Sequence, residues 1–490
     1  MTAWRSVLVE HFARVKRDRS SDVAICALSE DRVLRFEEVW EDFLAFYRVL
    51  GTAGLRPGSA IVSLVGNSAA FVSTLLAVLE HGGIVIPVDT GSTAAEAIRL
   101  IDQFSADAAI APAATRFSRP AGITPLPHNL ALFRFRSSWS SGVHEGAVFK
   151  LTSGSVGAPK AVSSSEINLV ADGNHIIEAM GIGPQDINLA MIPLSHSYGI
   201  GNLVVPLLLQ GSTFVSRQSF APHQLFDDVT RHRITVFPAV PFIFDYLRRH
   251  FSDRRFPSSL RLTVTAGASI QYETVAEFRR IFGLKIHSFY GTSETGGIAY
   301  DDSESIEHPL RVGRALPGTT ITLRPWDASC GRVHVRGDAV AASYAPGSAE
   351  DDATFCEQGF LTGDLGYFVG DELVLAGRLP RFVNVAGRKV QPDEVERVLL
   401  EIPEIANVCV LGLPCDKRGE MLVAVIVPEQ RQYVSPAAIR TYCSGRLSSH
   451  KIPRQYAFVD TLPVDSRGKT DLRAIESLFA QQLGVEPAES

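Results

Sequence analysis

The sequence lacks an apolar run long enough to cross a bilayer. Its longest apolar stretches lie near residues 71–79 and 203–209, well short of the roughly 20 residues that a membrane-spanning helix requires. The first residues carry charged side chains where a signal peptide needs an apolar run. We therefore expect neither a membrane span nor a secretory leader.

Cysteine is also scarce, and acidic residues slightly outnumber basic ones. The six cysteines form no C-x-x-C pair and no dense framework of the kind found in small disulfide-linked domains. We expect reduced thiols and a cytoplasmic location. The formal net charge of −6 argues against a protein that coats nucleic acid or binds anionic membranes.

The chain is too long for one hydrophobic core, and its composition is ordinary for a globular protein. It has 490 residues, of which 46% are hydrophobic and 20% charged, so we expect two or three domains. From residue 22 to 289 short apolar runs alternate with amphipathic segments, which predicts parallel sheets covered by helices. The expected strands are 60–65, 84–88, 147–151, 187–192, 234–237 and 262–265. Asp89 directly follows the second of them.

Helical spacing predicts a helix over 36–50 that stops at Gly51, and a second helix that reaches residue 79. Asn67 or Ser68 is expected to cap this second helix. Residues 112–145, rich in Pro, Ser and Arg, are interpreted as irregular surface.

After Gly313 the pattern changes to short strands at 319–323, 332–335 and 373–375, which indicates a small β-rich module. From about residue 381 a compact α+β unit is expected, with helices at 392–401 and 436–447 and strands at 406–411, 421–427 and 455–458. The predicted fold is α/β. A large N-terminal domain, residues 1–379, holds the parallel α/β sheets and the β-rich module, and a small mobile α+β domain, residues 380–490, follows.

One stretch carries the clearest chemical signal. The apolar run 147–151 leads into the small-residue loop LTSGSVGAPKAV, residues 151–162. Its glycines permit a tight turn, and its hydroxyls, N–H groups and the Lys160 ammonium can surround one anion, such as a polyphosphate. A flexible Ser/Gly linker is the alternative, although the preceding strand and the Pro-Lys ending favour the anion site. The spacing is not that of a Walker loop.

The segment FYGTSETGG, residues 289–297, carries a second signal. It follows a predicted strand at 284–288, and ligands bind at such strand ends in open α/β sheets. Glu294 can hold Mg²⁺ beside a phosphate, and Tyr290 can offer its face to a base. A tyrosine next to glycine is also typical of a turn.

Three charged residues further along the chain are weaker candidates. Asp364 and Arg378 can bind a diol from two sides, or they can form a surface ion pair. Lys469 follows Gly468 near the end of the chain, where a single lysine is usually only solvated.

Taken in order, these segments strongly resemble the adenylate-forming superfamily of acyl-CoA synthetases, amino-acid adenylation domains and beetle luciferases. The resemblance covers nearly the whole chain, from about residue 34 to 473. It implies an ATP-dependent acid–thiol ligase that activates a carboxylic acid as acyl-AMP, releases pyrophosphate and transfers the acyl group to the thiol of CoA. The implied cofactors are ATP, Mg²⁺ and CoA, or a phosphopantetheinyl carrier protein in place of CoA.

The resemblance also implies roles for individual residues. The catalytic residues are Lys469, Glu294 and Lys160, and Glu294 is also the metal ligand. The expected nucleotide- and cofactor-binding residues are Thr152, Ser153, Gly154, Ser155, Gly157, Gly267, Ala268, Tyr290, Gly291, Thr292, Ser293, Asp364, Arg378 and Gly387.

The pocket for the acid is expected from residues that are mostly apolar or small. This composition favours an aryl or medium aliphatic acid, and none of the residues is an obvious partner for a second charge on the substrate. They are His196, Tyr198, Gly199, Phe237, Val240, Gly291, Gly296, Gly297 and Ile298.

In the implied mechanism Lys469 bridges the acid carboxylate and the α-phosphate, so catalysis rests on positioning and electrostatic stabilisation. The small domain then rotates and Lys469 withdraws, while the loop around Gly387 lines the thiol entrance. The sequence departs from the family at the hinge, where Pro380 replaces Asp or Lys. Because proline fixes φ and lacks an N–H, either the pivot has moved by a residue or the second step is impaired.

Two alternatives stay open. A free-standing ligase can load a separate acyl carrier protein, since only a short tail without a carrier domain is expected after Arg473. A non-catalytic nucleotide-binding relative is the other, and the presence of all the charged site residues argues against it. An amino-acid substrate is disfavoured because His196 stands where amino-acid adenylation domains carry an aspartate-bearing motif. The expected partners are therefore a small carboxylic acid and CoA or a carrier protein, without nucleic acid.

Overall fold

The computed structural model divides into two compact units. Unit 1 comprises Met1–Arg324, Val333–Thr362 and Tyr367–Val374, and unit 2 comprises Pro325–Arg332, Gly363–Gly366 and Leu375–Ser490. The structure describes residues 5–89, 92–118, 120–135, 147–152, 160–306, 310–326, 329–346, 348, 354–378, 383–385, 388–390, 392–415, 419–429, 434–464, 470–471, 474–475 and 477–479, with 384, 388–389, 414–415 and 419–420 described by their backbone alone. The predicted domain boundary at residue 380 lies outside these ranges.

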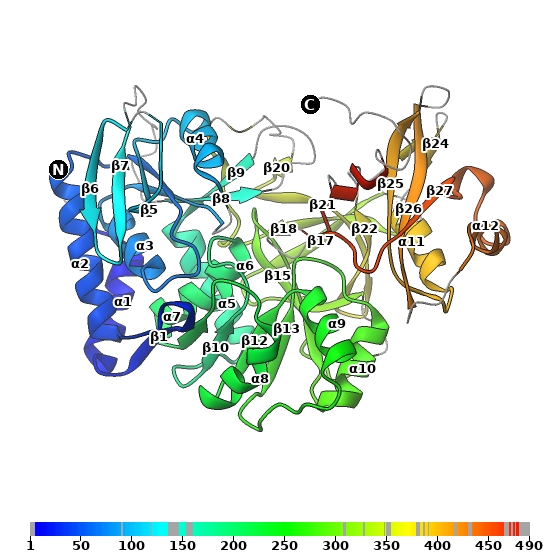
Figure 1. Cartoon of the computed structure of the whole chain (residues 1–490), viewed down its shortest axis with the longest axis horizontal. Helices are drawn as coiled ribbons and strands as arrows, with labels where there is room; N and C mark the ends of the chain where they lie inside the picture. The colour runs from blue at the N-terminus through cyan, green and yellow to red at the C-terminus, as the bar shows by residue number, and fades with distance from the viewer. Residues whose placement is uncertain are drawn as a thin grey trace. The chain divides into compact units, whose positions relative to one another are not determined.

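The larger sheet combines a parallel centre with antiparallel flanks (Figure 1). Strands β1, β11, β10, β12, β13 and β14 are parallel, whereas β15, β16 and β22 continue from β14 as antiparallel neighbours. In spatial order the described strands are β17 (Thr320–Pro325), β18 (Gly331–Arg336), β21 (Gly359–Val369), β22 (Glu372–Arg378), β16 (Arg311–Ala315), β15 (Gly296–Tyr300), β14 (Ile286–Thr292), β13 (Leu262–Thr265), β12 (Val236–Ala239), β10 (Ile187–Ala190), β11 (Thr213–Ser216), β1 (Val23–Ala27) and β2 (Arg32–Arg35), with β20 (Phe355–Cys356) paired to β21.

The second sheet of unit 1 has a parallel centre of β8, β4, β3 and β5. Antiparallel strands complete both of its sides. Its described order is β19 (Ser343–Tyr344), β9 (Lys160–Ser165), β8 (Ala147–Thr152), β4 (Ile84–Pro87), β3 (Ala60–Ser63), β5 (Ala108–Pro112), β7 (Leu130–Arg134) and β6 (Gly122–Leu126).

The parallel centres of both sheets bury both faces, and helices form the layers that cover them. In β3, Ile61 belongs to one apolar cluster and Val62 to another, because successive side chains point to opposite faces. The cluster that contains Ile61 also includes residues of β1 and β11 of the larger sheet, so it fills the space between the two sheets. Helices that contribute to this layer are α1 (Val7–Arg19), α2 (Phe36–Thr52), α3 (Phe71–Glu80), α5 (Glu166–Met180) and α7 (Val205–Gln210).

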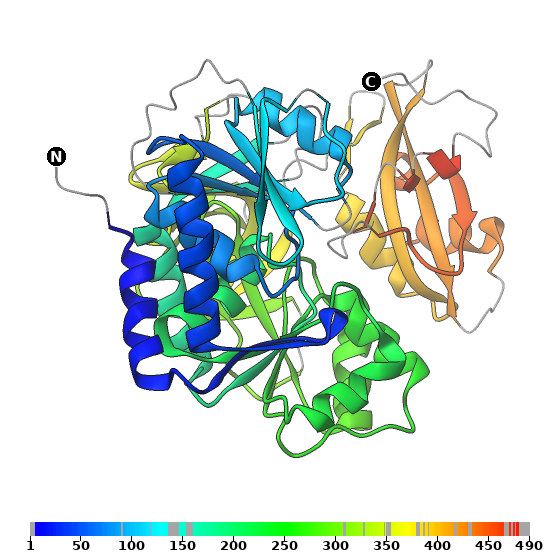
Figure 2. The same ribbon diagram turned by 60° about the vertical axis from the view of Figure 1, so that its left-hand side comes forward.

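Other helices cover the outer faces of the two sheets. Helix α4 (Ala94–Gln103) packs on the second sheet. Helices α8 (Pro222–Arg231), α9 (Pro241–His250) and α10 (Tyr272–Phe282) pack over β10, β12 and β14 of the larger sheet (Figure 1). Figure 2 shows α1 and α2 side by side in the layer between the sheets. This arrangement is the predicted α/β architecture.

Unit 2 is a smaller α+β structure. Strand β25 places Val408 and Val410 in one apolar cluster and Cys409 and Leu411 in another, so this sheet also buries both faces. Its described strands are β24 (Arg388–Val390), β23 (Val383–Val385), β26 (Gly419–Pro428) and β25 (Ile405–Cys415), with β27 (Gln455–Phe458) paired to β26, and helices α11 (Pro392–Leu400) and α12 (Pro436–Ser444) contribute to the first cluster. Within the described ranges, no helix of the protein is long and apolar enough to cross a membrane.

The interpretation of residues 112–145 as irregular surface is wrong for its central part. Strands β7 and β6 form a hairpin there, and β7 buries Leu132 on one face and Phe133 on the other. Strand β6 lies at the edge of its sheet, where Pro125 is tolerated because an edge strand has N–H positions without a ladder partner. His128 and Asn129 form the turn with positive φ angles. The proline and the exposed face of β6 hid the strand.

The predicted cap of α3 is also wrong. The helix begins at Phe71 without a side-chain cap. Asn67 instead accepts a hydrogen bond from Leu194 N at 2.7 Å and donates one to Ile192 O at 3.2 Å. The buried Ser68 hydroxyl has no partner among the described residues. Asn67 therefore ties the end of β3 to the segment that follows β10.

We expect Asn67→Ala to lower the free energy of unfolding by about 1–3 kcal/mol, because a buried N–H and carbonyl lose their partner. Ser68→Ala is the matched control and should change it by less than about 0.5 kcal/mol. Urea denaturation of the two variants provides the comparison, and equal losses would contradict the assigned role of Asn67.

Candidate active site

Strands β8 and β9 carry the two ends of the loop that the sequence assigns to phosphate. Thr152 lies opposite Lys160 in the antiparallel ladder, and the Thr152 hydroxyl donates to the Lys160 carbonyl at 3.3 Å. Lys160 thus begins a strand of the second sheet. The remaining predicted loop residues lie outside the described residues: Ser153, Gly154, Ser155 and Gly157.

Glu294 lies in a tight turn between β14 and β15 of the larger sheet. Thr292 Oγ1 accepts from Thr295 N at 3.3 Å, and the two hydroxyl oxygens are 3.0 Å apart. A Cβ at Gly291 would lie 2.6 Å from Gly296 O, so the strands close this tightly only with glycine at position 291. Position 294 is partly exposed. The turn therefore presents the Glu294 carboxylate on a fixed backbone.

Strand β14 begins two residues later than predicted and continues to Thr292. Tyr290 therefore lies within the strand and is only 8% exposed. Thr292 and Ser293 are partly exposed, and Gly291 is exposed, so the reachable part of the motif is the end of the strand and its turn. Base stacking on Tyr290 stays a prediction.

Tyr344 connects Lys160 with Glu294. Strand β19 pairs with β9, which places Tyr344 opposite Val162. The Tyr344 hydroxyl donates to Glu294 Oε1 at 3.0 Å, and the Lys160 ammonium lies 5.2 Å from the centroid of the same ring. An ammonium at that distance over an aromatic face is attracted by it. The structure therefore brings two predicted catalytic residues, 134 positions apart, onto one tyrosine.

Sequence reasoning missed Tyr344. It lies in a two-residue strand within a stretch of mostly small residues, where no periodic pattern exists. Its only sequence signal is a single aromatic residue in a stretch of small residues, which is too weak to identify a site residue.

A second group of polar residues surrounds the predicted pocket residue His196. The Ser195 hydroxyl donates to Asp89 Oδ1 at 2.7 Å, and His196 Nε2 lies 2.8 Å from the same oxygen without an aligned hydrogen bond. The Ser197 hydroxyl donates to the Ser293 hydroxyl at 2.9 Å. This segment therefore contacts both the end of β4 and the Glu294 turn. Sequence analysis marked Asp89 only as the end of a strand.

Two other predicted pocket residues have extensive core contacts. The Tyr198 hydroxyl donates to Val264 O at 3.1 Å, its ring stacks on Phe289 at 5.9 Å, and burial raises its pKa well above the usual value. Phe237 has no exposed surface and packs against Phe244 at 5.3 Å. Their contact with the acid stays a prediction.

The predicted glycine positions are close-packed. A Cβ at Gly199 would lie 2.1 Å from Pro193 O, and a Cβ at Gly296 would lie 2.5 Å from Asp172 Oδ1. Gly267 and Ala268, in contrast, are exposed directly after β13, and Gly267 has φ +89°. The end of β13 is therefore open to a ligand, as expected at the carboxyl end of a parallel strand.

In unit 2, Asp364 lies on β21 and Arg378 ends β22, and Arg378 Nε is 3.4 Å from Asp364 Oδ1. The pair is thus brought together as an ion pair, one of the two predicted arrangements. Gly387, Lys469 and Pro380 lie outside the described residues, although a bridge between Val464 and Thr470 closes the ends of the segment that contains Lys469.

The described side chains can hold Mg²⁺ only if a bound nucleotide supplies further oxygen ligands. The described residues contain no group of three or more His, Cys, Asp or Glu side chains suited to a metal ion. Mg²⁺ in nucleotide sites keeps several waters and takes one or two carboxylates together with substrate phosphates. Glu294, a partly exposed carboxylate with Oε1 fixed by Tyr344, supplies such a ligand.

We expect Tyr344→Phe to weaken the binding of ATP with Mg²⁺ by about 10- to 100-fold, since a hydrogen bond to a charged group contributes about 1.5–3 kcal/mol. The ring under Lys160 is retained, so the loss reports the hydroxyl alone. Calorimetric titration with ATP provides the measurement, and Tyr367→Phe, an exposed tyrosine elsewhere in unit 1, is the matched control. Unchanged affinity in Tyr344→Phe would exclude this role.

Two family models and several known relatives match the chain over most of its length. The family model of the AMP-binding enzyme matches residues 10–345, and that of the AMP-binding enzyme C-terminal domain matches residues 394–469. A probable CoA ligase of Humulus lupulus is 24% identical over 473 residues, which cover 89% of this chain and 90% of the relative. A mitochondrial malonate–CoA ligase of Homo sapiens is 25% identical in an alignment of 540 positions, gaps included, which covers 95% of this chain and 93% of the relative.

Solved structures share the fold. ATP-bound MatB from Rhodopseudomonas palustris aligns with a TM-score of 0.79 at 21% identity, covering 96% of this chain and 98% of MatB. The o-succinylbenzoate CoA synthetase of Bacillus subtilis, in complex with its acyl-adenylate intermediate, aligns with a TM-score of 0.77 at 22% identity. The alignment covers 94% of this chain and 96% of the synthetase. With the two family models spanning most of its length, the chain belongs to the AMP-binding enzymes of the adenylate-forming superfamily.

Proposed function

We propose that this protein is an ATP-dependent acid–CoA ligase, which activates a carboxylic acid as acyl-AMP and passes the acyl group to the thiol of CoA. The observation that supports it most directly is the contact of Lys160 and Glu294 with Tyr344. A cationic and an anionic side chain that share one tyrosine suit a magnesium–polyphosphate. Two relatives named above, a probable CoA ligase and a malonate–CoA ligase, align with this chain over nearly their whole length.

The first half-reaction requires two anions to meet, because the acid carboxylate attacks the α-phosphorus of ATP. Lys160, at the end of the phosphate loop, would bind the β- and γ-phosphates, and Lys469 would bind the carboxylate and the α-phosphate together. Bound Mg²⁺ would supply charge neutralisation for the departing pyrophosphate. The protein residues provide orientation and preorganised charge and make no covalent bond themselves.

Two further pairs of described residues have the chemistry to contact the adenine and the ribose. The exposed Gly267 and Ala268 after β13 suit the adenine, and Asp364 with Arg378 suits the ribose hydroxyls. An Asp carboxylate accepts from both hydroxyls of a diol, and the Arg378 guanidinium, 3.4 Å away, can hold its orientation.

We propose an aryl or medium aliphatic acid as substrate. The pocket residues are mostly apolar or small, and the ring of Tyr198 is held in place by stacking on Phe289. His196, held near Asp89, would be the polar group in this pocket. Relatives of similar overall identity are named for indoleacetate and for long-chain fatty acids, which shows how widely the acid varies around this fold.

Lys469→Ala is expected to slow acyl-AMP formation by about 10²- to 10³-fold, since it removes a charge contact made while carboxylate and phosphate combine. Thiolysis of supplied acyl-AMP should be largely retained. Rapid-quench measurement of each half-reaction provides the comparison. Equal losses in both half-reactions would contradict the assignment of Lys469 to adenylation alone.

A panel of aryl, aliphatic and dicarboxylic acids, tested by ATP–pyrophosphate exchange and then by capture with CoA or a phosphopantetheinyl carrier protein, tests the proposed function as a whole. We expect exchange with an aryl or medium aliphatic acid and capture by CoA. Capture by the carrier protein alone would identify a carrier-loading ligase. Background exchange with every acid would favour a non-catalytic nucleotide-binding relative.

A further inference from the structure

A carboxylate and a histidine meet where strands of the two sheets of unit 1 end. Asp89 follows β4 of the second sheet, and His196 lies in the segment that follows β10 of the larger sheet. His196 Nε2 is 2.8 Å from Asp89 Oδ1, and the Ser195 hydroxyl donates to the same oxygen at 2.7 Å. Both side chains of the pair are mostly buried, with 17% of Asp89 and 22% of His196 exposed.

Strand order and one hydrogen bond place this pair beside the candidate active site. Strands β4 and β8 are parallel neighbours, Asp89 follows the first, and Thr152 ends the second. Because the carboxyl ends of parallel strands share one edge of a sheet, Asp89 lies on the edge from which the predicted phosphate loop starts. In the segment of His196, the Ser197 hydroxyl donates to the Ser293 hydroxyl of the neighbouring sheet. On the proposed function, this is where the acid meets ATP.

A second carboxylate on the acid would be poorly accommodated at this pair. A carboxylate taken out of water needs a cationic or hydrogen-bonding partner. Among the predicted pocket residues, His196 alone has a side chain that can carry positive charge, and its buried Nε2 already faces Asp89. A second carboxylate would therefore meet the negative charge of Asp89 in place of a cation, and like charges repel strongly where water is scarce.

We propose that Asp89 is a specificity-determining residue that restricts the acid to monocarboxylates. The inference rests on the proposed function and narrows its substrate class. Asp89 faces the inner nitrogen of His196 and adds a negative charge to the pocket, so an acid with a neutral far end is accepted and one with an anionic far end is rejected. The hydrogen bond from Ser195 holds the carboxylate in this place.

Acids that differ in one charge test the restriction in the parent protein. An acid that supports exchange is compared with two analogues whose far end carries either a second carboxylate or a carboxamide of nearly the same shape, such as adipate and its monoamide. ATP–pyrophosphate exchange at saturating ATP and Mg²⁺ gives kcat/KM for each analogue. We expect the value for the monoamide to exceed that for the diacid by about 10- to 100-fold, because like charges in one site disfavour binding.

Two variants of Asp89 assign the restriction to its charge. Asp89→Asn removes the charge and keeps the shape, and its side-chain oxygen can still accept from the Ser195 hydroxyl. We expect kcat/KM of the diacid relative to the monoamide to rise by about 10- to 100-fold, mainly through a lower KM for the diacid, whereas exchange with the simple monocarboxylate changes by less than about fivefold. Asp89→Glu keeps the charge and should keep the relative value of the parent protein.

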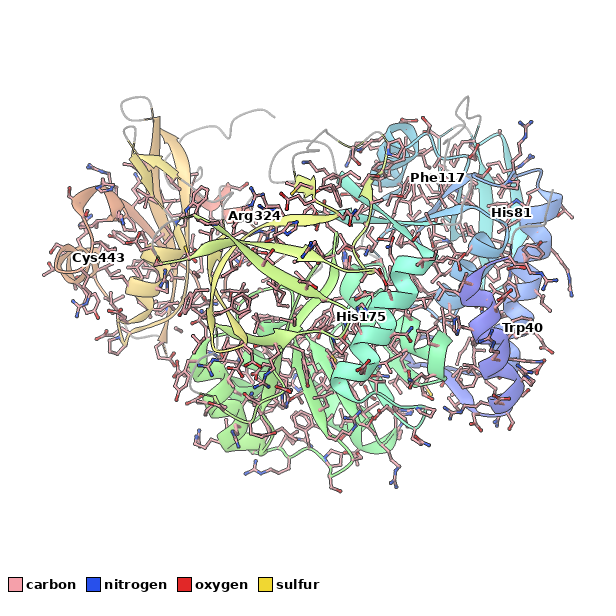
Figure 3. All side chains as sticks on the ribbon, turned by 180° about the vertical axis from the view of Figure 1, so that it is seen from behind. Trp40, His81, Phe117, His175, Arg324 and Cys443 are labelled. Atoms are coloured by element: carbon pink, nitrogen blue, oxygen red, sulfur yellow. The ribbon has the colours of Figure 1, made fainter. Side chains whose placement is uncertain are left out.

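Asp42→Asn is the matched control. Asp42 lies on α2, the helix that carries the labelled Trp40 in Figure 3. Its Oδ2 is 2.6 Å from His128 Nε2, and its side chain is 20% exposed, close to the value for Asp89. The variant removes the charge of another aspartate–histidine pair, so it should leave the relative kcat/KM of diacid and monoamide unchanged, whatever its effect on the melting temperature.

Equal kcat/KM for diacid and monoamide in the parent protein would overturn the inference, and so would rejection of both analogues, since size or polarity would then set the restriction. An unchanged relative value in Asp89→Asn, or an equal rise in Asp89→Glu or Asp42→Asn, has the same consequence. If Asp89→Asn does not fold, Asp89→Ser takes its place with the same expected and contradicting results. Background exchange with every acid in the parent protein would instead contradict the proposed function itself.

Discussion

The contact of Tyr344 with Glu294 and Lys160 is the interaction on which the proposed site depends. Lys160 begins a strand of the second sheet, and Glu294 belongs to a turn of the larger sheet. Tyr344 sits on the second sheet beside Lys160, and its hydroxyl reaches the carboxylate of the larger sheet. One side chain therefore relates the cation and the anion that a magnesium–nucleotide would require, before any ligand is bound.

The layered core explains how such a contact can be maintained. The parallel centres of both sheets bury both faces against helices, and one apolar layer lies between the sheets. A strand end in this arrangement has little freedom, because moving it disturbs packing on two sides. Asn67 and Asp89, which follow strands of the second sheet, form hydrogen bonds with Leu194 and Ser195 after β10 of the larger sheet, and Asp172 ties helix α5 to β15. Polar side chains thus fix the loops, and apolar packing fixes the strands.

The periodicity of apolar residues predicted the fold well, because helices and strands each produce a characteristic spacing among neighbouring residues. The strand at Leu262–Thr265 and the apolar helix over Phe71–Glu80 each carry their own signal. Edge strand β6, with a proline and one exposed face, carries almost none. The site divides in the same way. Lys160 and Glu294 stand in recognisable motifs, whereas Tyr344 and Asp172 contact residues 50 and 125 positions away, and local periodicity does not report such contacts.

A double-mutant cycle on Lys160 and Glu294 tests the central claim most directly. The binding free energy of ATP with Mg²⁺ would be measured for Lys160→Met, Glu294→Gln and the double variant. Because residues that share a partner are coupled, the account predicts an interaction energy of about 1–3 kcal/mol between the two positions, and a smaller one in a Tyr344→Phe background. Additive losses, with or without the Tyr344 hydroxyl, would contradict it.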